Sequence, residues 1–361
     1  MVLLGTPAAI ATPLPDDPAC SIFPADNPWN QRVDSLPVAA GSTALVRGMQ
    51  LTRLHPDFSD SDAEGYGIPF NVVSASTARK VVAFDYADES DAGPYPIPPH
   101  PQIEGGSDHH LLLLDRDACR LYELFAAART GNDWHAGSGA IFELGSNTLR
   151  PDTWTSADAA GLPIFPGLAR HDEVAAGAID HALRVTIPVS QRAYLWPGRH
   201  YASSRTEPWL APMALRLRIK PGYDISGYPT QSRIILRAAQ RYGLIVADNG
   251  SAGFISGAPA PGWNDDDLHS LHGVPASAFE VVDTSSLPNT PRRARIWNRR
   301  FDHPTRSTAR ARFFLSRRSR VTLRASRNGR VVRRVRVSAR QGYVQVRMRA
   351  VRGAKYSVVV S

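Results

Sequence analysis

The sequence is short of lysine, of cysteine and of long hydrophobic runs. Of its 42 basic residues only Lys80, Lys220 and Lys355 are lysines, so arginine carries almost all of the positive charge. Arginine binds carboxylates and phosphates through two parallel hydrogen bonds, and this bias therefore affects which partners the chain suits. No apolar run approaches the roughly 18 residues that a membrane-spanning helix needs. We expect a protein without a membrane-spanning segment.

The common catalytic signatures are also missing. The chain has no H-E-x-x-H, no pair of C-x-x-C motifs, no G-x-S-x-G, no G-x-G-x-x-G and no phosphate-binding loop that ends in Gly-Lys. These motifs place metal ligands, nucleophiles or phosphate-binding amides at fixed spacings. Their absence argues against a zinc protease, an α/β-hydrolase or a nucleotide-dependent enzyme of the standard type.

The two cysteines, Cys20 and Cys119, are typical of a single disulfide in a secreted protein. A lipid-modified Cys20 is the less favoured alternative, because two aspartates and a proline precede it. The apolar stretch Met1–Ala11 ends in small residues but lacks a preceding basic segment. We interpret residues 1–19 as a signal-peptide remnant, with a disordered leader as the alternative. The predicted localisation is secreted and extracellular.

Charge divides the chain into two parts. Residues 291–361 contain 22 of the 42 basic residues and one acid, Asp302, which leaves a net charge of +21 there and −12 in the remainder. Such a division is not expected of one continuous domain. The predicted organisation is a leader at 1–19, a β-rich main domain at 20–283, a Ser/Pro/Thr/Arg-rich linker at 284–298 and an arginine-rich β-sandwich at 299–361.

The hydrophobic pattern of the body indicates a mixed, strand-dominated fold. Leu111–Leu114 and Cys119–Phe125 flank a turn sequence and predict a β-hairpin, and the run of leucines predicts a strand buried on both faces. Residues 230–242 have apolar side chains at helical spacing, a hydroxyl cap candidate and Gly243 as a stop. They predict the one clear helix of the body.

The C-terminal part alternates almost continuously between apolar and polar residues. Val321, Leu323 and Ala325 are predicted to face inward, and Asn328-Gly329 is typical of a two-residue hairpin turn. Runs at 330–337, 343–348 and 356–360 repeat the pattern. The expected fold class is therefore mixed α+β with a β-dominated body, plus a small antiparallel β-sandwich whose exposed face carries arginines.

Several strings of the body occur together in a fixed order. They are Tyr95–Pro98 with Glu104–Gly106, Asp108–Glu123, Trp134–Ala140, Trp154–Pro163, Asp172–Leu183, Trp196–Tyr201 and Tyr242–Asn249. This set, which covers residues 24–283, resembles a family of uncharacterised secreted proteins from actinobacteria and other soil microbes. The resemblance implies an extracellular setting. It supplies no catalytic residues, because it brings no established activity with it.

Glu123 is the strongest single catalytic candidate. Alternation along its strand predicts that it points inward among apolar side chains, where burial raises the pKa of an unpaired carboxylic acid as a general acid requires. A second carboxylate, Asp108, Asp158 or Asp180, would complete a glycosidase-like pair. A structural ion pair with Arg184 or Arg199 is the favoured alternative.

Histidines occur loosely in strings rich in tryptophan, glycine and carboxylates. Alternation predicts that His110 and Asp108 lie on one face of their strand. The spacing lacks the i,i+4 or H-x-H pattern of many metal sites, so buried hydrogen-bond networks are favoured over a metal centre. The acid–base candidates are Glu123, His110, Asp108, His135, Asp180, His181 and His200.

Aromatic residues beside glycine and proline are typical of loops that stack on sugar rings. The substrate-binding candidates are Trp134, Trp196 and Tyr201, together with Arg199, which suits the carboxylate of a uronic acid. Ordinary core packing is the alternative for each aromatic residue.

No cofactor is identified from the sequence. The acidic turn Asn264–Asp267 lacks the spacing of an EF-hand loop. A calcium ion at Asp265 and Asp267 is therefore less favoured than a helix cap by Asp266 or Asp267.

Two functional hypotheses follow. The first is a secreted carbohydrate-active enzyme, a glycoside hydrolase or polysaccharide lyase, with the basic tail as an anchor on an anionic cell-wall polymer. The second is a non-catalytic extracellular protein that binds a polysaccharide or cell surface. We expect a monomer without sequence-specific nucleic-acid binding, since the tail lacks interleaved aromatic residues and a recognition helix. Convergence of Glu123, His110, His181 and His200 in one tryptophan-walled cleft would favour the enzyme.

Overall fold

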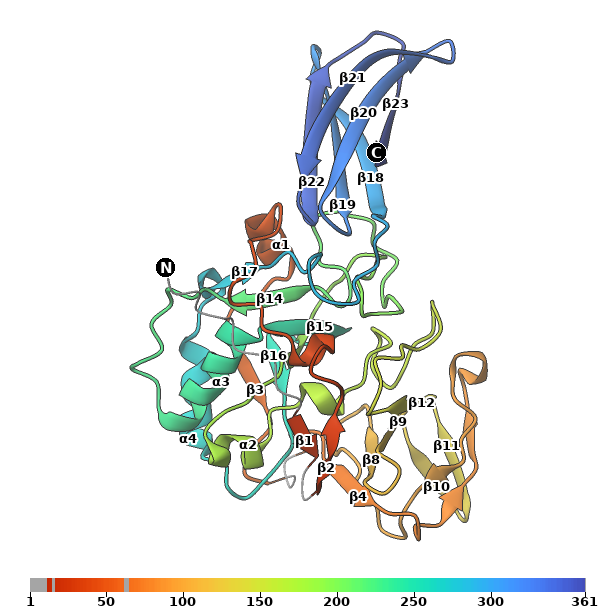
Figure 1. Cartoon of the computed structure of the whole chain (residues 1–361), viewed down its shortest axis with the longest axis vertical. Helices are drawn as coiled ribbons and strands as arrows, with labels where there is room; N and C mark the ends of the chain where they lie inside the picture. Colours follow the sequence, from red (N-terminus) through yellow and green to blue (C-terminus); the bar gives the residue numbers. More distant parts are fainter. Residues whose placement is uncertain (1–11, 15–16, 62–64, 361) are drawn as a thin grey trace.

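The structure is a computed structural model that describes residues 12–14, 17–61 and 65–360 (Figure 1). Strands make up 36% and helices 14%, which confirms the predicted β-dominated mixed class. Of the predicted leader at 1–19, residues 1–11 and 15–16 lie outside the described residues. Its described part belongs to a small antiparallel pair of strands, β1 (Thr12–Leu14) and β2 (Asp17–Ile22).

A six-stranded mixed sheet forms the centre of the body. In spatial order its strands are β17 (Phe279–Val281), β14 (Arg216–Ile219), β15 (Leu244–Asn249), β13 (Leu183–Ile187), β16 (Phe254–Ser256) and β3 (His55–Asp57). β13 and β15 run parallel to each other. β14 is antiparallel to β15, and β16 is antiparallel to β13. The helices α2 (His171–Ala176), α3 (Thr230–Arg241) and α4 (Asp265–His269) lie together on one side of the body (Figure 1).

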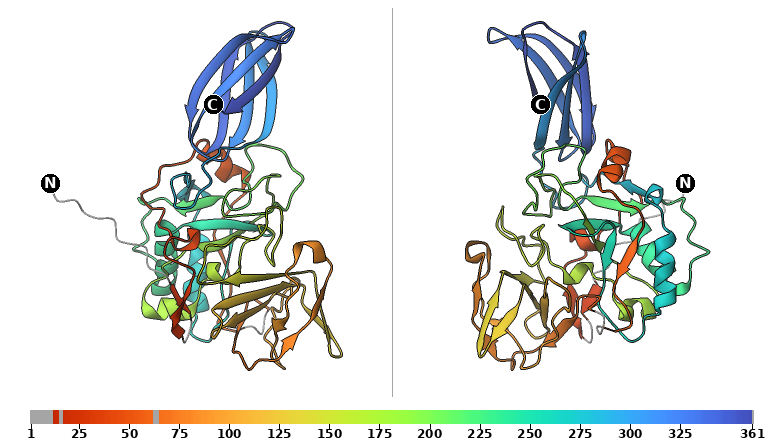
Figure 2. Two further views of the ribbon diagram at one scale, coloured as in Figure 1. Left: turned by 45° about the vertical axis from the view of Figure 1, so that its right-hand side comes forward. Right: turned by 180° about the vertical axis from the view of Figure 1, so that it is seen from behind.

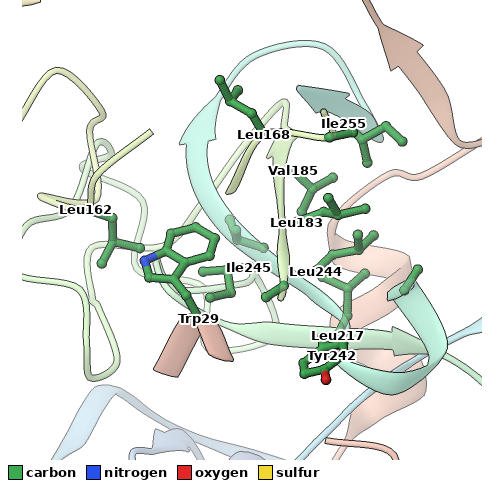
Figure 3. Packing of buried hydrophobic residues seen from close by; sticks show 14 of the residues in the cluster. Trp29, Leu162, Leu168, Leu183, Val185, Leu217, Tyr242, Leu244, Ile245 and Ile255 are labelled. Atoms are coloured by element: carbon green, nitrogen blue, oxygen red, sulfur yellow. The ribbon is translucent and has the colours of Figure 1, made fainter. Parts of the chain in front are cut away.

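The middle strands of this sheet are almost continuously apolar because both of their faces are covered. Figure 3 shows Leu183 and Val185 of β13 beside Leu244 and Ile245 of β15, all of them buried. Removing one such side chain from water contributes about 1.5–3 kcal/mol. The sheet is therefore a rigid base for the loops that leave its strand ends.

A second, four-stranded sheet contains the predicted hairpin. Its order is β12 (Ser138–Glu143), β9 (Arg120–Phe125), β8 (Leu111–Asp115) and β4 (Phe70–Val73). Leu112 and Leu114 join the main core, whereas Leu111 and Leu113 pack into a second apolar cluster on the opposite face. The prediction of a strand buried on both faces is confirmed.

Short elements complete the body. The strands are β5 (Arg79–Lys80), β6 (Val82–Phe84), β7 (Tyr95–Pro96), β10 (Ala128–Thr130) and β11 (Asp133–Ala136). The further helices are α1 (Ser42–Gly48) and the 3₁₀ turns η1 (Pro28–Asn30), η2 (Ala87–Glu89), η3 (Phe165–Gly167), η4 (Ser270–Gly273) and η5 (Ala276–Ala278). β10, β11 and β6 form one sheet and β5 and β7 another.

The predicted helix is α3, but its predicted hydroxyl cap is wrong. Pro229 occupies the N-cap position, and no side chain of the helix start supplies the cap. Instead, the Asp267 carboxylate accepts the backbone N–H groups of Gln231 (2.9 Å) and Ser232 (2.8 Å). The unpaired amides of the first turn are thus satisfied by a residue distant in sequence.

The predicted disulfide between Cys20 and Cys119 is present and joins β2 to the turn that precedes β9. Among the described residues, no helix has both the length and the apolar character needed to span a bilayer.

The C-terminal part is a sandwich of two antiparallel three-stranded sheets that stands at one end of the body (Figures 1 and 2). One sheet contains β18 (Ile296–Thr305), β19 (Thr308–Leu315) and β22 (Gly342–Arg349); the other contains β21 (Arg330–Ala339), β20 (Ser319–Arg327) and β23 (Lys355–Val360). Val321, Leu323 and Ala325 are buried as predicted. Asn328 and Gly329 both have positive φ in the two-residue turn between β20 and β21. β18 begins at Ile296, inside the range predicted as linker.

The sandwich is joined to the body by backbone hydrogen bonds. The Ala40 amide donates to the Gln341 carbonyl, and the Tyr343 amide donates to the Ala40 carbonyl, each at 2.8 Å. Gly342 between them has φ of +124°, and a Cβ atom there would lie 2.2 Å from the Ala40 carbonyl oxygen. Only glycine permits this close approach.

Candidate active site

The predicted catalytic residues do not converge in one cleft. Glu123 and His110 lie inside the core, Asp180 and His181 lie near α2, His135 lies on β11, Asp108 is exposed and His200 lines a cavity. The cleft expected for the enzyme hypothesis therefore cannot be built from this set. An active site in this protein must include other residues.

Glu123 points inward as predicted, but it has no access to solvent. Its carboxylate accepts the backbone N–H groups of Ile164 and Phe165 at 2.9 Å. Burial raises the pKa of Glu123 to about 7, although these two hydrogen bonds lower it. The alternative of an ion pair with Arg184 or Arg199 is wrong, because the Glu123 carboxylate binds backbone amides at the start of η3 instead. Glu123 fixes the position of η3 and does not reach a substrate.

His110 is a second buried charged group. Its Nδ1 lies 2.6 Å from a Glu104 carboxylate oxygen, and its Nε2 lies 3.1 Å from the Ala157 carbonyl oxygen. Both ring nitrogens face acceptors, which is the arrangement of a protonated imidazole. Burial opposes protonation, yet the Glu104 carboxylate raises the pKa of His110. This ion pair ties the start of β8 to the loop around Ala157.

Asp158 forms the central ion pair of the core. Its two carboxylate oxygens each accept a hydrogen bond from the Arg184 guanidinium at 2.8 Å, and Arg184 also donates to the Ser256 hydroxyl at 2.6 Å. A bidentate pair of this kind holds both partners in a fixed orientation. Arg199 pairs with Asp152 at 3.3 Å instead.

The loop from Trp154 to Pro163 folds tightly around this ion pair. The Ser156 hydroxyl donates to the Leu162 carbonyl at 2.6 Å, which closes the loop on itself. Gly161 has φ of +67°, and a Cβ atom there would lie 2.5 Å from the Trp154 carbonyl oxygen. The loop thereby directs Asp158 into the core and leaves Ala159 partly exposed.

Ala159 holds two polar side chains in place. Its carbonyl accepts a hydrogen bond from His200 Nδ1 at 3.0 Å, so that Nε2 of a neutral ring is left as an acceptor. Its amide donates to a carboxylate oxygen of Asp248 at 3.4 Å. Asp248 lies in the last part of β15, where the strand leaves the core. His200 and Asp248 are therefore attached to the same loop residue.

These two side chains line a cavity of about 360 Å³ in the body. The lining residues are Tyr86, Glu89, Phe125, Ser138, Thr155, Ser156, Ala157, Ala159, His200, Ala202 and Asp248. The lining therefore combines aromatic rings, hydroxyl groups and two carboxyl groups. None of these described lining residues is a lysine or arginine. The cavity has the size and mixed lining of a small-ligand site.

Asp248 and Glu89 differ in their surroundings. The Asp248 side chain is 26% exposed. Burial together with the nearby charge of Asp158 raises its pKa to about 7, although the Arg184 guanidinium 3.9 Å away lowers it. Glu89 is partly exposed and accepts the backbone N–H of Thr155 at 2.9 Å. General acid–base catalysis uses a carboxylic acid that keeps its proton near neutral pH and a second, ionised carboxylate in the same cavity.

His181 belongs to a separate buried network, and Asp180 next to it is partly exposed. His181 Nε2 lies 3.1 Å from a Glu173 carboxylate oxygen, and Glu173 also pairs with Arg170 at 3.0 Å. Asp180 accepts a hydrogen bond from the Tyr242 hydroxyl at 3.4 Å. This network attaches α2 to the sheet, which is the structural role that the sequence favoured for the histidines.

The remaining catalytic candidates are exposed. His135 forms an ion pair with Asp85 at 3.1 Å on the outside of β11. Asp108 is exposed, so it does not share the buried environment of His110. Neither residue lines a described cavity.

The predicted substrate-binding residues also separate. Trp134 is buried in the second apolar cluster, which agrees with the alternative of ordinary core packing. Trp196 and Arg199 line a cavity of about 90 Å³ beside the C-terminal part of the chain. Tyr201 stacks on His200 with ring centroids 5.3 Å apart and thereby orients that side chain.

Among the described residues, no group of three or more His, Cys, Asp or Glu side chains is placed to hold a metal ion. In the acidic turn, Asn264 caps α4 by accepting the Asp267 amide at 3.0 Å, and the Asp267 carboxylate caps α3. The Asp265 carboxylate accepts the Asp60 amide at 3.2 Å. The predicted cap of a short helix by Asp266 or Asp267 is therefore wrong: Asn264 caps the short helix α4, and Asp267 caps the longer helix α3.

Sequence reasoning missed Asp248 and Glu89. A signal for Asp248 was available, because it follows the buried run Leu244–Ala247, and polar residues at the carboxyl ends of sheet strands often face ligands. Glu89 lies in η2 and carries no local signal.

Comparison of the chain with protein-family models, with curated proteins and with solved structures finds no match. The resemblance to secreted actinobacterial proteins stays a prediction.

Proposed function

We propose that the protein is a secreted glycoside hydrolase whose active site is the cavity that contains Asp248, Glu89 and His200. The observation that carries the proposal is the pair of carboxylates in one cavity, of which Asp248 has its pKa raised to about 7. Glycoside cleavage by most known hydrolases uses one protonated and one ionised carboxyl group.

In this mechanism Asp248 donates its proton to the glycosidic oxygen as the bond to the sugar breaks. Glu89 acts as the ionised carboxylate, which stabilises or captures the developing positive charge or activates a water molecule. His200 Nε2 accepts a hydrogen bond from a sugar hydroxyl, because Nδ1 is already bound to the Ala159 carbonyl. Tyr86 and Phe125 offer aromatic surface to the sugar ring.

The charge of the cavity favours a neutral glycan over an acidic one. The ionised carboxylate of Glu89 repels a uronate or phosphate group, and no arginine or lysine is among the described residues that line the cavity. A lyase needs a cation to neutralise the uronate carboxylate, and Arg199, the predicted candidate, pairs with Asp152 elsewhere. These observations support a hydrolase rather than a lyase.

An extracellular location belongs to the same proposal. The disulfide between Cys20 and Cys119 is of the kind that persists in oxidising compartments.

The test is hydrolysis of a panel of neutral and acidic polysaccharides by the full chain, measured as released reducing ends. We expect product from a neutral glycan, with activity falling as the pH rises through about 7 because Asp248 loses its proton. Asp248→Asn and Glu89→Gln should each reduce the rate by about 10²-fold or more. The matched control is Asp88→Asn, which changes the exposed carboxylate beside Glu89 and should leave the rate unchanged.

Unaltered product release by Asp248→Asn and Glu89→Gln would overturn this active site. Glycan binding in the cavity without product from any member of the panel would favour the second hypothesis, a non-catalytic polysaccharide-binding protein.

A further inference from the structure

A second, larger cleft lies where the body meets the C-terminal sandwich. It has a volume of about 570 Å³ and is lined by residues of α1, of the segment around Trp209, of β19 and of β22. Its charged lining residues are Arg47, Arg205 and Arg312, and no carboxylate is among the described residues that line it. The cleft is thus opposite in charge to the cavity that contains Asp248.

The positive charge around this cleft exceeds the nearby negative charge. Glu207 accepts two hydrogen bonds from Arg205 at 3.1 Å and also lies 3.7 Å from Arg300. Asp302 is shared in the same way between Arg310 and Arg312. The carboxylates of Glu207 and Asp302 are therefore each shared by two guanidinium groups.

Arg47 adds a charge without any such compensation. It lies exposed in the last turn of α1, and its guanidinium has no hydrogen-bond or ion-pair partner in the part of the chain that the structure describes. A carboxylate in the cleft would supply the missing counter-charge.

Trp209 holds the guanidinium groups of Arg300 and Arg312 in place. The guanidinium carbons of Arg312 and Arg300 lie 5.3 and 5.6 Å from its ring centroid, and Tyr343 packs against it edge-on at 6.3 Å. Stacking on an aromatic ring limits the freedom of a guanidinium and thus reduces the entropy lost on binding a planar anion.

From this geometry we infer that the cleft binds an acidic polysaccharide through the carboxylates of its uronic acid residues. Guanidinium groups match planar carboxylates in a bidentate manner. The amides of Gln50 and Gln345 at the rim provide donors and acceptors for sugar hydroxyls. A nucleic acid suits the cleft less well, since two guanidiniums already occupy the Trp209 ring and base stacking needs a free aromatic face.

This inference is independent of the proposed hydrolase site. The acidic polymer is held at the junction, whereas the neutral glycan is cleaved in the body. Asp248→Asn should therefore bind the acidic polymer as the unmodified protein does, whatever its effect on hydrolysis.

The experiment is calorimetric titration of the full chain with tetragalacturonate at low and at physiological salt. We expect Arg47→Gln combined with Arg205→Gln to weaken binding by about tenfold or more, because the unpaired guanidinium of Arg47 and the positive charge of Arg205 are both lost. The matched control is Arg324→Gln combined with Arg334→Gln. It removes the same charge from directly paired positions on β20 and β21, away from the cleft, and should change the affinity less than about twofold.

An equal loss of affinity in both double variants would overturn the inference, since it would show attraction to the overall charge of the sandwich. Absence of tetragalacturonate binding to the unmodified protein at low salt would overturn it as well, as would tighter binding of a single-stranded oligonucleotide of equal charge.

A second measurement covers the case in which the double variant does not fold. Phenylglyoxal modifies accessible arginines, and the modified positions are mapped by mass spectrometry on the unmodified protein. Tetragalacturonate should protect Arg47 and Arg205 at least about fivefold more than Arg324 and Arg334. Uniform protection would contradict a site in the cleft.

Discussion

Five arginine side chains of the body are buried and meet carboxylates or carbonyls there, whereas the arginines of the C-terminal sandwich stay outside a core of apolar residues. Arg170 and Arg184 are almost fully buried and pair with Glu173 and Asp158. In the sandwich the core cluster consists of alanine, valine, leucine, phenylalanine and methionine, with arginines such as Arg324 on the outside. Charge therefore orients loops in the body and is available to partners on the sandwich.

The largest expected effect follows from removing one partner of the buried pair. Arg184→Met leaves the Asp158 carboxylate buried without a counter-charge and should lower the free energy of unfolding by about 3–5 kcal/mol. Arg324→Met, the same change on the sandwich, should alter it by less than about 0.5 kcal/mol. Urea denaturation followed by tryptophan fluorescence measures both.

The double variant Arg184→Met with Asp158→Leu is the control for this prediction. It removes both charges and should be clearly more stable than Arg184→Met alone. If Arg324→Met proved as damaging as Arg184→Met, the contrast between the two regions would be lost.

A smaller effect concerns pH. Because burial raises the pKa of Glu123 from 4.5 to about 7, its contribution to stability is complete below pH 4.5 and is lost as the pH rises through about 7. The loss amounts to about 3 kcal/mol over this range. In the sandwich the pKa of Asp302 is lowered by its hydrogen bonds with Arg310, so its contribution is lost in the opposite direction, as the pH falls.

Denaturation midpoints of the unmodified protein and of Glu123→Gln, measured from pH 4 to 8, test this prediction. The stability of the variant should depend less on pH between 4.5 and 7. Parallel curves for the two proteins would show that Glu123 does not titrate in this range.

The smallest effect belongs to the sandwich hairpin. Gly329 has φ of +75° in the turn, and no neighbouring atom lies within 4 Å of the position that an alanine Cβ would take, so Gly329→Ala meets only backbone strain. It should destabilise the protein by about 1 kcal/mol. Gly222→Ala in the body, at a position equally open but without positive φ, is the control and should change stability little. Equal effects of the two substitutions would contradict a type I′ turn.

Local patterns predicted much of the fold because they report on neighbours in the same strand or helix. The alternation around Leu323, the helix that ends near Gly243 and the hairpin after Leu114 each follow from a few consecutive residues. The inward direction of Glu123 was predictable for the same reason. Its partners were not, since they are backbone amides of η3, about 40 residues further along the chain.

The candidate site depended on contacts between distant segments and was therefore harder to predict. Asp248 comes from β15, His200 from a loop and Glu89 from a 3₁₀ turn. They line one cavity because each is hydrogen-bonded to the loop that contains Thr155 and Ala159. The cap of α3 by Asp267 is a further example. In each case the sequence shows the residue type but not its partner.

The disulfide also determines how the chain behaves after it has been cut. Cys20 and Cys119 enclose the segment that contains β3 to β8. A protease that cleaves once anywhere between them produces two fragments that stay covalently linked, so the nicked protein migrates as one species until a reducing agent is added. After a single cut in this segment, β2 thus stays attached to the rest of the body.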